Sequence, residues 1–387
     1  MEIFDITATT FFGLEQVLAN ELEALGAKDI KILNRAVIFR GDTELLYKCN
    51  LWLRTALKIL VPIAKFDAKN ERDLYNRVYN INWEKYFTVN QTFAIDSVVS
   101  GPNFTHSKYV ALKTKDAICD MFRDKKGRRP DVDVEYPDLR LNIHIYNSDC
   151  TISLDSTGVP MSKRGYKTRQ TFAPLNEVMA AGILKLAGWD TKQSLIDPMC
   201  GSGTFPIEAC MMAMNIAPGT YRNFAFEKWN NYNAEIWTNL KKEARKVAKR
   251  ECTTKIIGYD CDPAALDVAS SNAIKAGLEE FIDFDRIDFF ENNNQSRNIF
   301  IIMNPPYGER LEDADKMVEF YKKIGDKLKA CYTDCKAWIL SGNLDAIKKL
   351  GLHPSVKIKL FNGPIECKLE CFELYGGSKK AKFNNQE

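Results

Sequence analysis

The sequence lacks the features that mark several large classes of protein. Its 387 residues include only 3 histidines, His106, His144 and His353, whose wide separation argues against a histidine-based metal site or catalytic triad. The longest apolar stretches, such as 299–303, fall far short of the roughly 20 residues that a membrane-spanning helix needs. The first residues, Met-Glu-Ile-Phe-Asp, lack the basic region of a secretory signal. We therefore expect a soluble cytoplasmic protein.

The net charge and the cysteines exclude few classes of protein, but both agree with a soluble cytoplasmic protein. The net charge of +3, from 54 basic and 51 acidic residues, is too small to indicate a nucleic-acid binder by itself. The 11 cysteines are odd in number and scattered, which is typical of reduced thiols. Cys331 with Cys335 and Cys367 with Cys371 could together supply four thiolates. A helix end and a buried strand face explain these pairs better, and we expect no metal site.

The first 155 residues predict two small α+β units. Residues 1–43 contain a strand, a helix, two strands and the start of a second helix, an order that suggests a ferredoxin-like unit. Residues 44–155 form the second unit, with strands predicted at 93–99, 132–136, 139–146 and 150–154 and a helix at 107–122. The aromatic residues expected in its core are Phe104, Tyr109, Phe122 and Tyr136.

After a connector over 156–170, residues 171–377 alternate between strands and helices. The predicted strands cover 194–197, 255–260, 284–288, 299–304 and 337–341, and the predicted helices cover 204–214, 263–276, 314–330 and 343–350. Two final β runs at 356–361 and 367–375 flank an Asn-Gly-Pro turn and suggest a hairpin. The alternation predicts an α/β domain with a parallel, doubly wound sheet. Residues 378–387 form a polar tail.

The first segment that indicates chemistry is Leu-Ile-Asp-Pro-Met-Cys-Gly-Ser-Gly-Thr, residues 195–204. A short apolar strand leads to Asp197, and Gly201 and Gly203 permit a tight turn and close approach of the backbone to a ligand. Thr204 is expected to cap the next helix, whose N–H groups suit an anionic group, a carboxylate or a phosphate. The segment lacks the Lys-Ser/Thr of a P-loop and the third glycine of the dinucleotide fingerprint.

The second segment, residues 256–263, is a strand that ends in an acidic residue. The carboxylate of Asp260 can accept hydrogen bonds from both ribose hydroxyls of a nucleoside cofactor. Asp262 is assigned instead to capping the helix that begins at Pro263. Asp260 follows Gly203 by 57 residues (260 − 203) because an insert of unassigned role, 215–254, lies between them. Asp288 ends the next strand and could accept from an adenine amine or serve only as a turn residue.

The third and most specific segment is Asn304-Pro305-Pro306-Tyr307, which follows an apolar strand. The prolines stiffen the turn and leave its carbonyls free as acceptors. The Asn304 side-chain oxygen and the Pro305 carbonyl can then accept from one exocyclic amine, while the ring of Tyr307 stacks on the base. Two fixed acceptors stabilise the positive charge that develops as such a nitrogen attacks a methyl donor.

These three segments resemble the motifs of class I S-adenosylmethionine-dependent N-methyltransferases. The whole chain resembles the THUMP-domain ribosomal RNA guanine-N2 methyltransferases, which implies a Rossmann-like methyltransferase domain after a ferredoxin-like unit and a THUMP domain. The resemblance implies catalytic roles for Asn304, Pro305, Pro306 and Tyr307. The residues it implies for S-adenosylmethionine binding are Pro174, Asn176, Glu177, Asp197, Cys200, Gly201, Ser202, Gly203, Thr204, Asp260 and Asp288.

This resemblance changes the interpretation of a basic run within residues 44–155. Its members are Lys113, Lys115, Arg123, Lys125, Lys126, Arg128 and Arg129, accompanied by Asp116, Asp120 and Asp124. Alone, such a run is typical of a solvated helix end. In a THUMP-like unit it is interpreted as a surface that contacts RNA phosphates.

We therefore expect an enzyme that methylates N2 of a guanine in structured RNA, with large-subunit ribosomal RNA as the first substrate to test. Three alternatives remain open: a transfer RNA guanine-N2 methyltransferase, a DNA adenine-N6 methyltransferase, and an RNA-binding factor without catalysis. The amine motif serves any planar amine, so it does not distinguish guanine from adenine. The sequence does not indicate the modified nucleotide or the oligomeric state.

Overall fold

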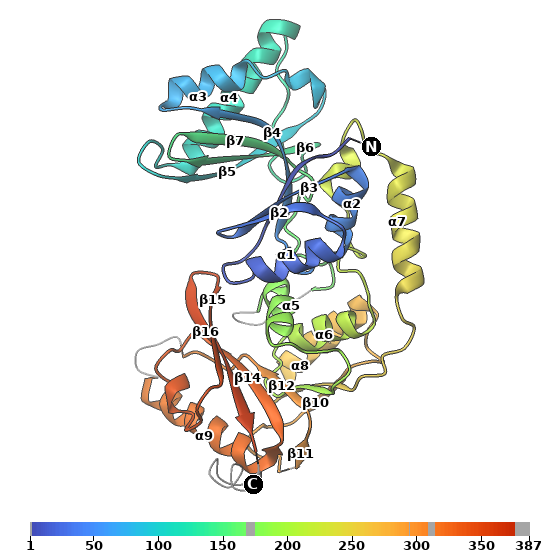
Figure 1. The fold of residues 1–387 in the computed structure, drawn as a ribbon, viewed down its shortest axis with the longest axis vertical. Coiled ribbons are helices and arrows are strands. Elements are labelled where there is room, and N and C mark those ends of the chain that lie inside the picture. Colours follow the sequence, from blue (N-terminus) through green and yellow to red (C-terminus); the bar gives the residue numbers. More distant parts are fainter. Residues whose placement is uncertain (1, 168–174, 294, 309–313, 376–387) are drawn as a thin grey trace. The chain divides into compact units, whose positions relative to one another are not determined.

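The computed structural model describes residues 2–167, 175–293, 295–308 and 314–375. The chain forms two compact units from interleaved segments, each with its own seven-stranded sheet (Figure 1). The first unit comprises Met1–Thr10, Ala19–Met161 and Arg222–Lys242, and the second comprises Phe11–Leu18, Ser162–Tyr221 and Glu243–Glu387. The predicted tail, 378–387, lies outside the described residues.

One half of the first sheet has the ferredoxin-like order that the sequence predicted. Its elements are β1 (Phe4–Thr9), α1 (Glu15–Ala24), β2 (Lys28–Leu33), β3 (Ala36–Gly41), α2 (Thr43–Trp52) and β4 (Lys58–Asp67). The strands run in the order β2-β3-β1-β4 and pair antiparallel. β4 was not predicted, and a proline such as Pro62 is unusual inside a central strand. Pro62 is tolerated beside a register shift, beyond the three residues that pair with β1.

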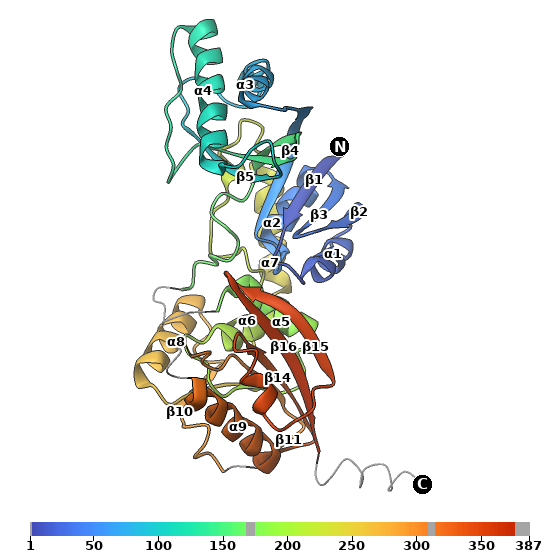
Figure 2. The same ribbon diagram turned by 90° about the vertical axis from the view of Figure 1, so that its left-hand side faces the viewer.

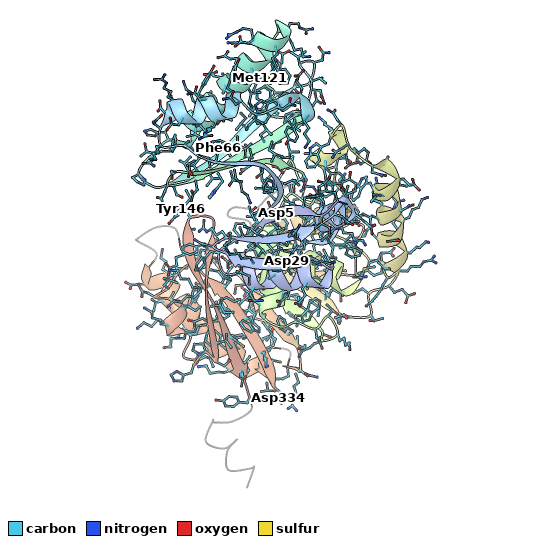
Figure 3. The ribbon with its side chains drawn as sticks, turned by 45° about the horizontal axis from the view of Figure 1, so that its top comes forward. Asp5, Asp29, Phe66, Met121, Tyr146 and Asp334 are labelled. Atoms are coloured by element: carbon cyan, nitrogen blue, oxygen red, sulfur yellow. The ribbon has the colours of Figure 1, made fainter. Side chains whose placement is uncertain are left out.

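The other half of the first sheet extends from β4 through β7 (Asp149–Asp155) and β6 (Leu139–Tyr146) to β5 (Phe93–Ser100). The helices α3 (Glu71–Tyr79) and α4 (Ser107–Lys126) lie side by side on one face (Figure 1). Alternate strand residues face these helices, so Met121 of α4 and Phe66 of β4, labelled in Figure 3, belong to the same core. The predicted helix and three of the four predicted strands are confirmed.

The predicted strand at 132–136 was wrong. Only Val132 forms an isolated bridge, with Phe93. The Asp133 side chain accepts hydrogen bonds from the backbone N–H groups of Glu135 and Tyr136, at 3.0 and 2.9 Å, and folds the segment into a turn. Tyr136 is consequently 76% exposed and Tyr109 is 43% exposed, whereas Phe104 and Phe122 are buried as expected.

The insert at 215–254 contributes a short helix, η2 (Ala225–Lys228), and the helix α7 (Ala234–Val247). The ring of Phe226 stacks on Tyr47 of α2 with centroids 4.1 Å apart, and Trp237 of α7 meets both rings edge-on. The buried residues of α7, Trp237, Leu240 and Ala244, recur every three or four positions, so the helix buries one stripe and exposes the rest.

The second sheet has the doubly wound arrangement that the alternating pattern predicted. Its strands are β8 (Leu195–Asp197), β9 (Ile256–Asp260), β10 (Asp283–Arg286), β12 (Phe300–Met303), β14 (Cys335–Ser341), β15 (Val356–Asn362) and β16 (Ile365–Leu374). They lie in the order β10-β9-β8-β12-β14-β16-β15. The first five are mutually parallel, and β15 and β16 form the predicted antiparallel hairpin beside β14 (Figure 2).

Helices cover both faces of this sheet. They are α5 (Glu177–Leu186), α6 (Thr204–Ala213), α8 (Pro263–Ala276) and α9 (Ala314–Cys331), while β11 (Ser296–Arg297) pairs with β13 (Tyr332–Thr333) outside the main sheet. Every residue of β12 is buried. Ile301 and Met303 pack in a cluster with α9, whereas Phe300 contacts Trp189, just after α5. Its continuous apolar run therefore reflects burial on both faces.

The helix predicted at 343–350 was wrong, since only the short helix η4 (Ile347–Lys349) forms there. Asn343 accepts from the N–H of Ala346 at 2.9 Å and starts a turn, but Gly351 at φ 65° ends the run. The carbonyl of Leu350 packs directly against Gly325 of α9.

The residues that the structure describes include no candidate membrane-spanning helix and no candidate metal site. None of the helices there is long and apolar enough to cross a membrane. No group of three or more His, Cys, Asp or Glu side chains in that part of the chain could hold a metal ion. Cys331, Cys335, Cys367 and Cys371 are buried free thiols.

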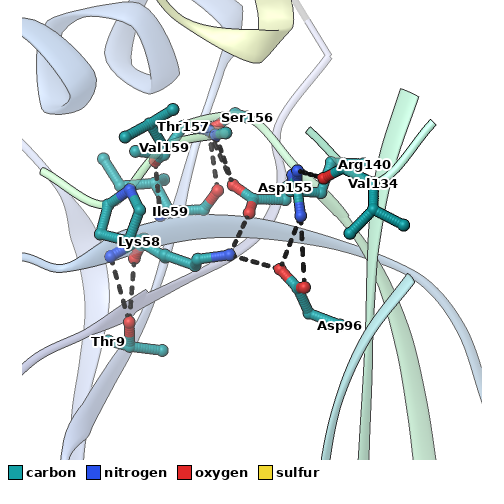
Figure 4. A network of polar contacts seen from close by, with 12 residues as sticks. Thr9, Lys58, Ile59, Asp96, Val134, Arg140, Asp155, Ser156, Thr157 and Val159 are labelled. Atoms are coloured by element: carbon teal, nitrogen blue, oxygen red, sulfur yellow. Dashed lines mark hydrogen bonds and ion pairs between the residues drawn. The ribbon is translucent and has the colours of Figure 1, made fainter. Parts of the chain in front are cut away.

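A partly buried ion-pair network joins four strands of the first unit (Figure 4). The Lys58 ammonium lies 2.8 Å from Asp155 and 2.7 Å from Asp96, which also pairs with Arg140 at 3.2 Å. Asp155 is fully buried and accepts from the N–H groups of Thr157 and Gly158. Burial opposes the charge of Lys58, but the two carboxylates outweigh it and raise its pKa. The network therefore compensates the buried charge of Asp155.

Lys58→Met should destabilise the first unit by about 3–5 kcal/mol, because it leaves the carboxylate of Asp155 buried without its counter-charge. Urea denaturation followed by tryptophan fluorescence supplies the measurement. Lys65→Met is the matched control, since its pair with Asp5 is exposed and should contribute about 0–1 kcal/mol. Equal losses in the two variants would contradict the role given to the network.

Candidate active site

The polar residues singled out at strand ends come together at one edge of the second sheet. Asp197 ends β8, Asp260 ends β9, Asp288 follows β10, and Asn304 follows β12. Because the four strands are parallel neighbours, their carboxyl ends meet at the same edge. All four residues line one cavity of about 1450 Å³. The direction of winding reverses between β8 and β12, the position at which such sheets bind ligands.

The loop after β8 forms one wall of this cavity. The N–H of Gly201 donates to Asp260 at 2.9 Å and so ties the loop to the end of β9. Gly203, at φ 75°, is the N-cap of α6, which corrects the prediction that Thr204 caps it. A Cβ at Gly203 would lie 3.0 Å from Ala269 and Phe284, so close packing as well as the turn requires glycine. Of the residues predicted here to bind the cofactor, Cys200, Gly201, Ser202 and Thr204 line the cavity and Gly203 does not, while Pro198 and Met199 line it as well.

The cavity is strongly acidic. Its lining includes five carboxylates, Asp197, Asp260, Asp262, Asp288 and Asp345, and no lysine or arginine among the described residues. Burial raises the pKa of Asp197 well above its usual range, and the nearby charge of Asp260 adds to the shift. Burial raises the pKa of the Cys200 thiol in the same way. Burial thus favours the neutral form of Asp197, and Asp345 is paired with Lys348 at 2.8 Å, so the acidity of the site rests on Asp260, Asp262 and Asp288. These residues suit a cationic, hydroxyl-bearing ligand and oppose a phosphate.

The aspartates of the cavity accept different hydrogen bonds from the backbone. Asp260 accepts from the N–H groups of Gly201 and Asp262, at 2.9 and 3.0 Å. Asp262 is the N-cap of α8 and accepts from Ala264 at 2.9 Å, as predicted. Asp288 accepts from the N–H of Phe290 at 2.8 Å. Each carboxylate keeps further lone pairs, so these bonds orient the groups without exhausting them.

The Asn-Pro-Pro-Tyr segment forms the opposite part of the lining. The hydroxyl of Tyr307 donates to Oδ1 of Asn304 at 2.6 Å, a contact that the sequence analysis did not anticipate. Burial raises the pKa of Tyr307, with the nearby Cys367 thiol contributing, so the hydroxyl remains a donor. The ring of Tyr307 lies against Gly342, where an added Cβ would approach it to 2.7 Å. Asn304 thus keeps one oxygen lone pair and its NH₂ group for a ligand.

Two side chains behind the segment hold its carbonyls. Asn343 donates to the Tyr307 carbonyl at 2.8 Å, and the Tyr321 hydroxyl lies 3.3 Å from the Pro306 carbonyl. The sequence analysis missed Asn343 and Asp345, although both follow β14 and line the cavity. The rule that polar residues at the carboxyl ends of parallel strands form the site would have found them.

The residues before α5 are only partly brought to the cavity. Asn176 caps α5 and accepts from Val178 at 2.9 Å, and Glu177 is buried 3.6 Å from Lys167. Neither belongs to the described lining of the cavity, and Pro174 lies outside the described residues. Leu175 does line it, and its carbonyl accepts from Lys167 at 2.7 Å. These polar residues therefore hold the backbone at Leu175 in position.

The basic run predicted to contact RNA lies at the end of α4 and is largely paired with acids. Lys126 and Arg129 lie 2.7 Å from Glu84 and Asp120 respectively, and Lys125 lies 3.7 Å from Glu84. Arg123 pairs with Asp120 and Asp124, Lys115 pairs with Asp116, and Lys113 lies over the ring of Tyr75. Arg128 is exposed. The local positive charge is thus smaller than the sequence run suggests.

Three family profiles together match most of the chain. The RMKL-like methyltransferase domain profile matches residues 164–370, the THUMP domain profile 68–155, and the RlmL ferredoxin-like domain profile 5–60. A protein of Synechocystis sp. with the provisional name of an RNA methyltransferase is 38% identical over 369 residues, which are 95% of this chain and 96% of that protein. The ribosomal RNA large subunit methyltransferase K/L of Syntrophotalea carbinolica is 38% identical over 381 residues.

This chain spans about half of that second relative, 53% of its length against 95% of its own. Among solved structures, the SMU.472 protein, provisionally named a methyltransferase and crystallised with SAH, superimposes with a TM-score of 0.86. It is 32% identical and the match covers 98% of this chain and 100% of the other. The protein therefore belongs to the family with an RMKL-like methyltransferase domain preceded by a THUMP domain and an RlmL-type ferredoxin-like domain.

Proposed function

We propose that this protein transfers a methyl group from S-adenosylmethionine to the exocyclic N2 amine of a guanine in ribosomal RNA, with large-subunit RNA as the substrate. The observation that carries the proposal is the acidic cavity at the reversal point of the sheet, with the Asn304 amide at the carboxyl end of β12. One side of that cavity can bind a cationic nucleoside, and the other side supplies hydrogen-bond acceptors for an amine.

The residues present fit this cofactor. S-adenosylmethionine supplies a methyl group that its positively charged sulfur makes electrophilic, and the acidic lining, in which no lysine or arginine is described, favours such a charge. Asp260 would accept from ribose hydroxyls with the lone pairs that its two backbone bonds leave free. The first turn of α6 offers the N–H groups of Thr204 and Phe205, which have no acceptor within the helix. A terminal carboxylate of the ligand suits those donors.

The amine chemistry follows from the acceptors of the Asn-Pro-Pro-Tyr segment. Oδ1 of Asn304 would accept from the target amine with the lone pair that Tyr307 does not use. That bond strengthens as the nitrogen gains positive charge, so it lowers the barrier more than it tightens substrate binding. No strong general base is required, because the protonated product amine is acidic. The Tyr307 hydroxyl would act by holding the Asn304 amide in the accepting orientation.

The choice of RNA rests on the rest of the chain. A THUMP domain profile matches residues 68–155, and the Syntrophotalea relative is named for ribosomal RNA of the large subunit. A base inside structured RNA has to leave its stack to reach a cavity of this kind. The basic residues of α4 would contact phosphates, although most already have acidic neighbours.

Asp260→Asn should weaken S-adenosylmethionine binding by about 1.5–3 kcal/mol, because an amide replaces a charge-assisted acceptor of the ribose hydroxyls. Isothermal titration calorimetry measures the change. Asp262→Asn is the comparison variant: asparagine caps a helix about as well as aspartate, so the fold should stay intact, and the loss of one lining charge should cost less affinity than the loss at Asp260. An affinity loss in Asp262→Asn as large as that in Asp260→Asn would contradict the assignment of ribose binding to Asp260.

Asn304→Ala should lower the rate of methyl transfer by about 10²–10³-fold, the cost of losing an acceptor that acts on a developing charge. Tyr307→Phe should lower that rate by roughly 2–12-fold, since it removes one neutral hydrogen bond of about 0.5–1.5 kcal/mol that orients Asn304. Single-turnover kinetics with radiolabelled cofactor measure both, and calorimetry checks that cofactor affinity is unchanged. Full activity of Asn304→Ala would refute the mechanism.

The product identifies the target base. RNA from a strain that lacks the gene is the substrate, and digestion followed by chromatography of the nucleosides locates the label. Label in N2-methylguanine supports the proposal, whereas label in N6-methyladenine would overturn the guanine assignment and leave the amine mechanism standing. Absence of label from ribosomal RNA, with label in transfer RNA, would overturn the ribosomal assignment alone.

Neutralising Lys125, Lys126, Arg128 and Arg129 of the α4 end should reduce the slope of log affinity against log salt. Removal of a single lysine–phosphate or arginine–phosphate interaction should lower that slope by about 0.7–0.9. The change should stay below the full value for four such interactions, because three of the four residues are already paired with Glu84 or Asp120. Filter binding to ribosomal RNA over a salt series provides the test, and an unaltered slope would identify this run as a solvated helix end.

A further inference from the structure

The insert that the sequence analysis left unassigned ends in a second basic segment. Residues 241–251 include six basic and two acidic residues, a net charge of +4 that exceeds the +3 of the whole chain. Four of the basic residues, Arg245, Lys246, Lys249 and Arg250, lie in the second unit and are here called the α7 patch. Arg245 and Lys246 lie in the last turn of α7, and Lys249 and Arg250 lie in the three residues that follow the helix.

The patch is fully exposed and its backbone is held in place. All four side chains are exposed, whereas Trp237, Leu240 and Ala244 bury one side of α7. Just past the helix end, the N–H of Lys249 donates to the Met214 carbonyl at 2.8 Å, and Asn215 donates to the Val247 carbonyl at 3.3 Å. The cations are therefore presented by a fixed segment rather than by a free loop.

The patch differs from the α4 run in what surrounds its charges. Within the described part of the chain, none of its four residues has a carboxylate at ion-pair distance, while three of the four cations tested on α4 do. Compensation of the helix dipole does not account for this cluster of four cations, because the C-terminus of α7 carries only about half a negative charge. Unpaired, fixed cations form a surface for a polyanion.

We propose that the α7 patch binds the phosphate backbone of the substrate RNA away from the target nucleotide. The inference rests on the proposed RNA substrate. An acidic protein partner is the rival, but specific protein interfaces are built around large apolar anchors, and Val247 is the one exposed apolar side chain within the segment 245–250. RNA needs no such anchor, because its affinity comes mainly from phosphate contacts.

The α7 patch lies away from the cavity that would hold the reacting groups. The backbone at Met214 anchors it one residue beyond α6, whose first turn lines the cavity. Ten residues of α-helix span about 15 Å, so the patch lies too far from the cavity to touch the reacting base or the cofactor. Phosphates repeat about every 3.4 Å along each strand of a duplex, so a structured RNA covers that distance in four or five steps. The patch should therefore govern RNA affinity and not the chemical step.

The test replaces Arg245, Lys246, Lys249 and Arg250 together by glutamine, which keeps helix propensity and removes four positive charges. The matched control replaces Lys255, Lys323, Lys329 and Lys359 by glutamine, four exposed lysines of the same unit that each pair with a carboxylate. Both variants fall by the same net charge, so any difference between them reports the patch. The probe is unmodified large-subunit ribosomal RNA made by transcription in vitro.

The patch variant should lower the salt slope of RNA binding by about 3 and raise KM for RNA at least tenfold, with kcat at saturating RNA and cofactor affinity unchanged. The control should change the slope and KM little, because exposed pairs contribute weakly. A slope and KM equal to those of the control would overturn the assignment and leave an acidic protein surface as the partner. A loss of kcat at saturating RNA would overturn it as well, by indicating a structural role.

Failure of the proposed function would have a different signature. If the wild-type protein transfers no label to any RNA, the enzymatic proposal falls, while the salt slope of RNA binding still reports the patch. If the wild type labels RNA and the patch variant binds it like the control, the patch inference alone falls.

Discussion

The parallel pairing of β8 with β12 is the constraint on which the site depends. On its other side β8 continues to β9 and β10, while β12 continues to β14, so the winding of the chain reverses between them. The loops that leave the two strands diverge and open a crevice at their carboxyl ends. Asp197 and Asn304 are far apart in the sequence, and this pairing brings them to one cavity. The glycines of the loop after β8 allow its backbone to line that cavity.

Charge is segregated in a way that the small net charge conceals. The described lining of the cavity holds five carboxylates and no cation, whereas exposed cations collect at the ends of α4 and α7. An acidic cavity attracts a sulfonium and repels phosphates, so it separates the binding of the cofactor from that of the RNA backbone. A flipped base, which is neutral, can still enter such a cavity while its phosphates remain outside.

Hydrogen bonds from behind the site fix groups that the motif alone leaves free. Tyr307 orients the Asn304 amide, Asn343 holds the Tyr307 carbonyl, and Gly342 makes room for the tyrosine ring. These contacts preorganise acceptors at the position where positive charge would develop, so little reorganisation is needed during reaction. On the other wall, Lys167 holds the carbonyl of Leu175 in the same manner.

The sequence alone determined the family of folds, the order of units and most of the strand-end residues, because periodicity, turn glycines and prolines act on neighbouring residues. Tertiary structure decided the rest. Pro62 sits in a central strand because a register shift accommodates it, and Asp133 converts a predicted strand into a turn. The Tyr307 hydroxyl bonds to Asn304. Lys126 at the end of α4 meets Glu84 from a distant segment, whereas no carboxylate in the described part of the chain lies at ion-pair distance from the α7 patch. Such contacts depend on how distant segments pack and on register, and a charge run or motif carries no information about its partners in space.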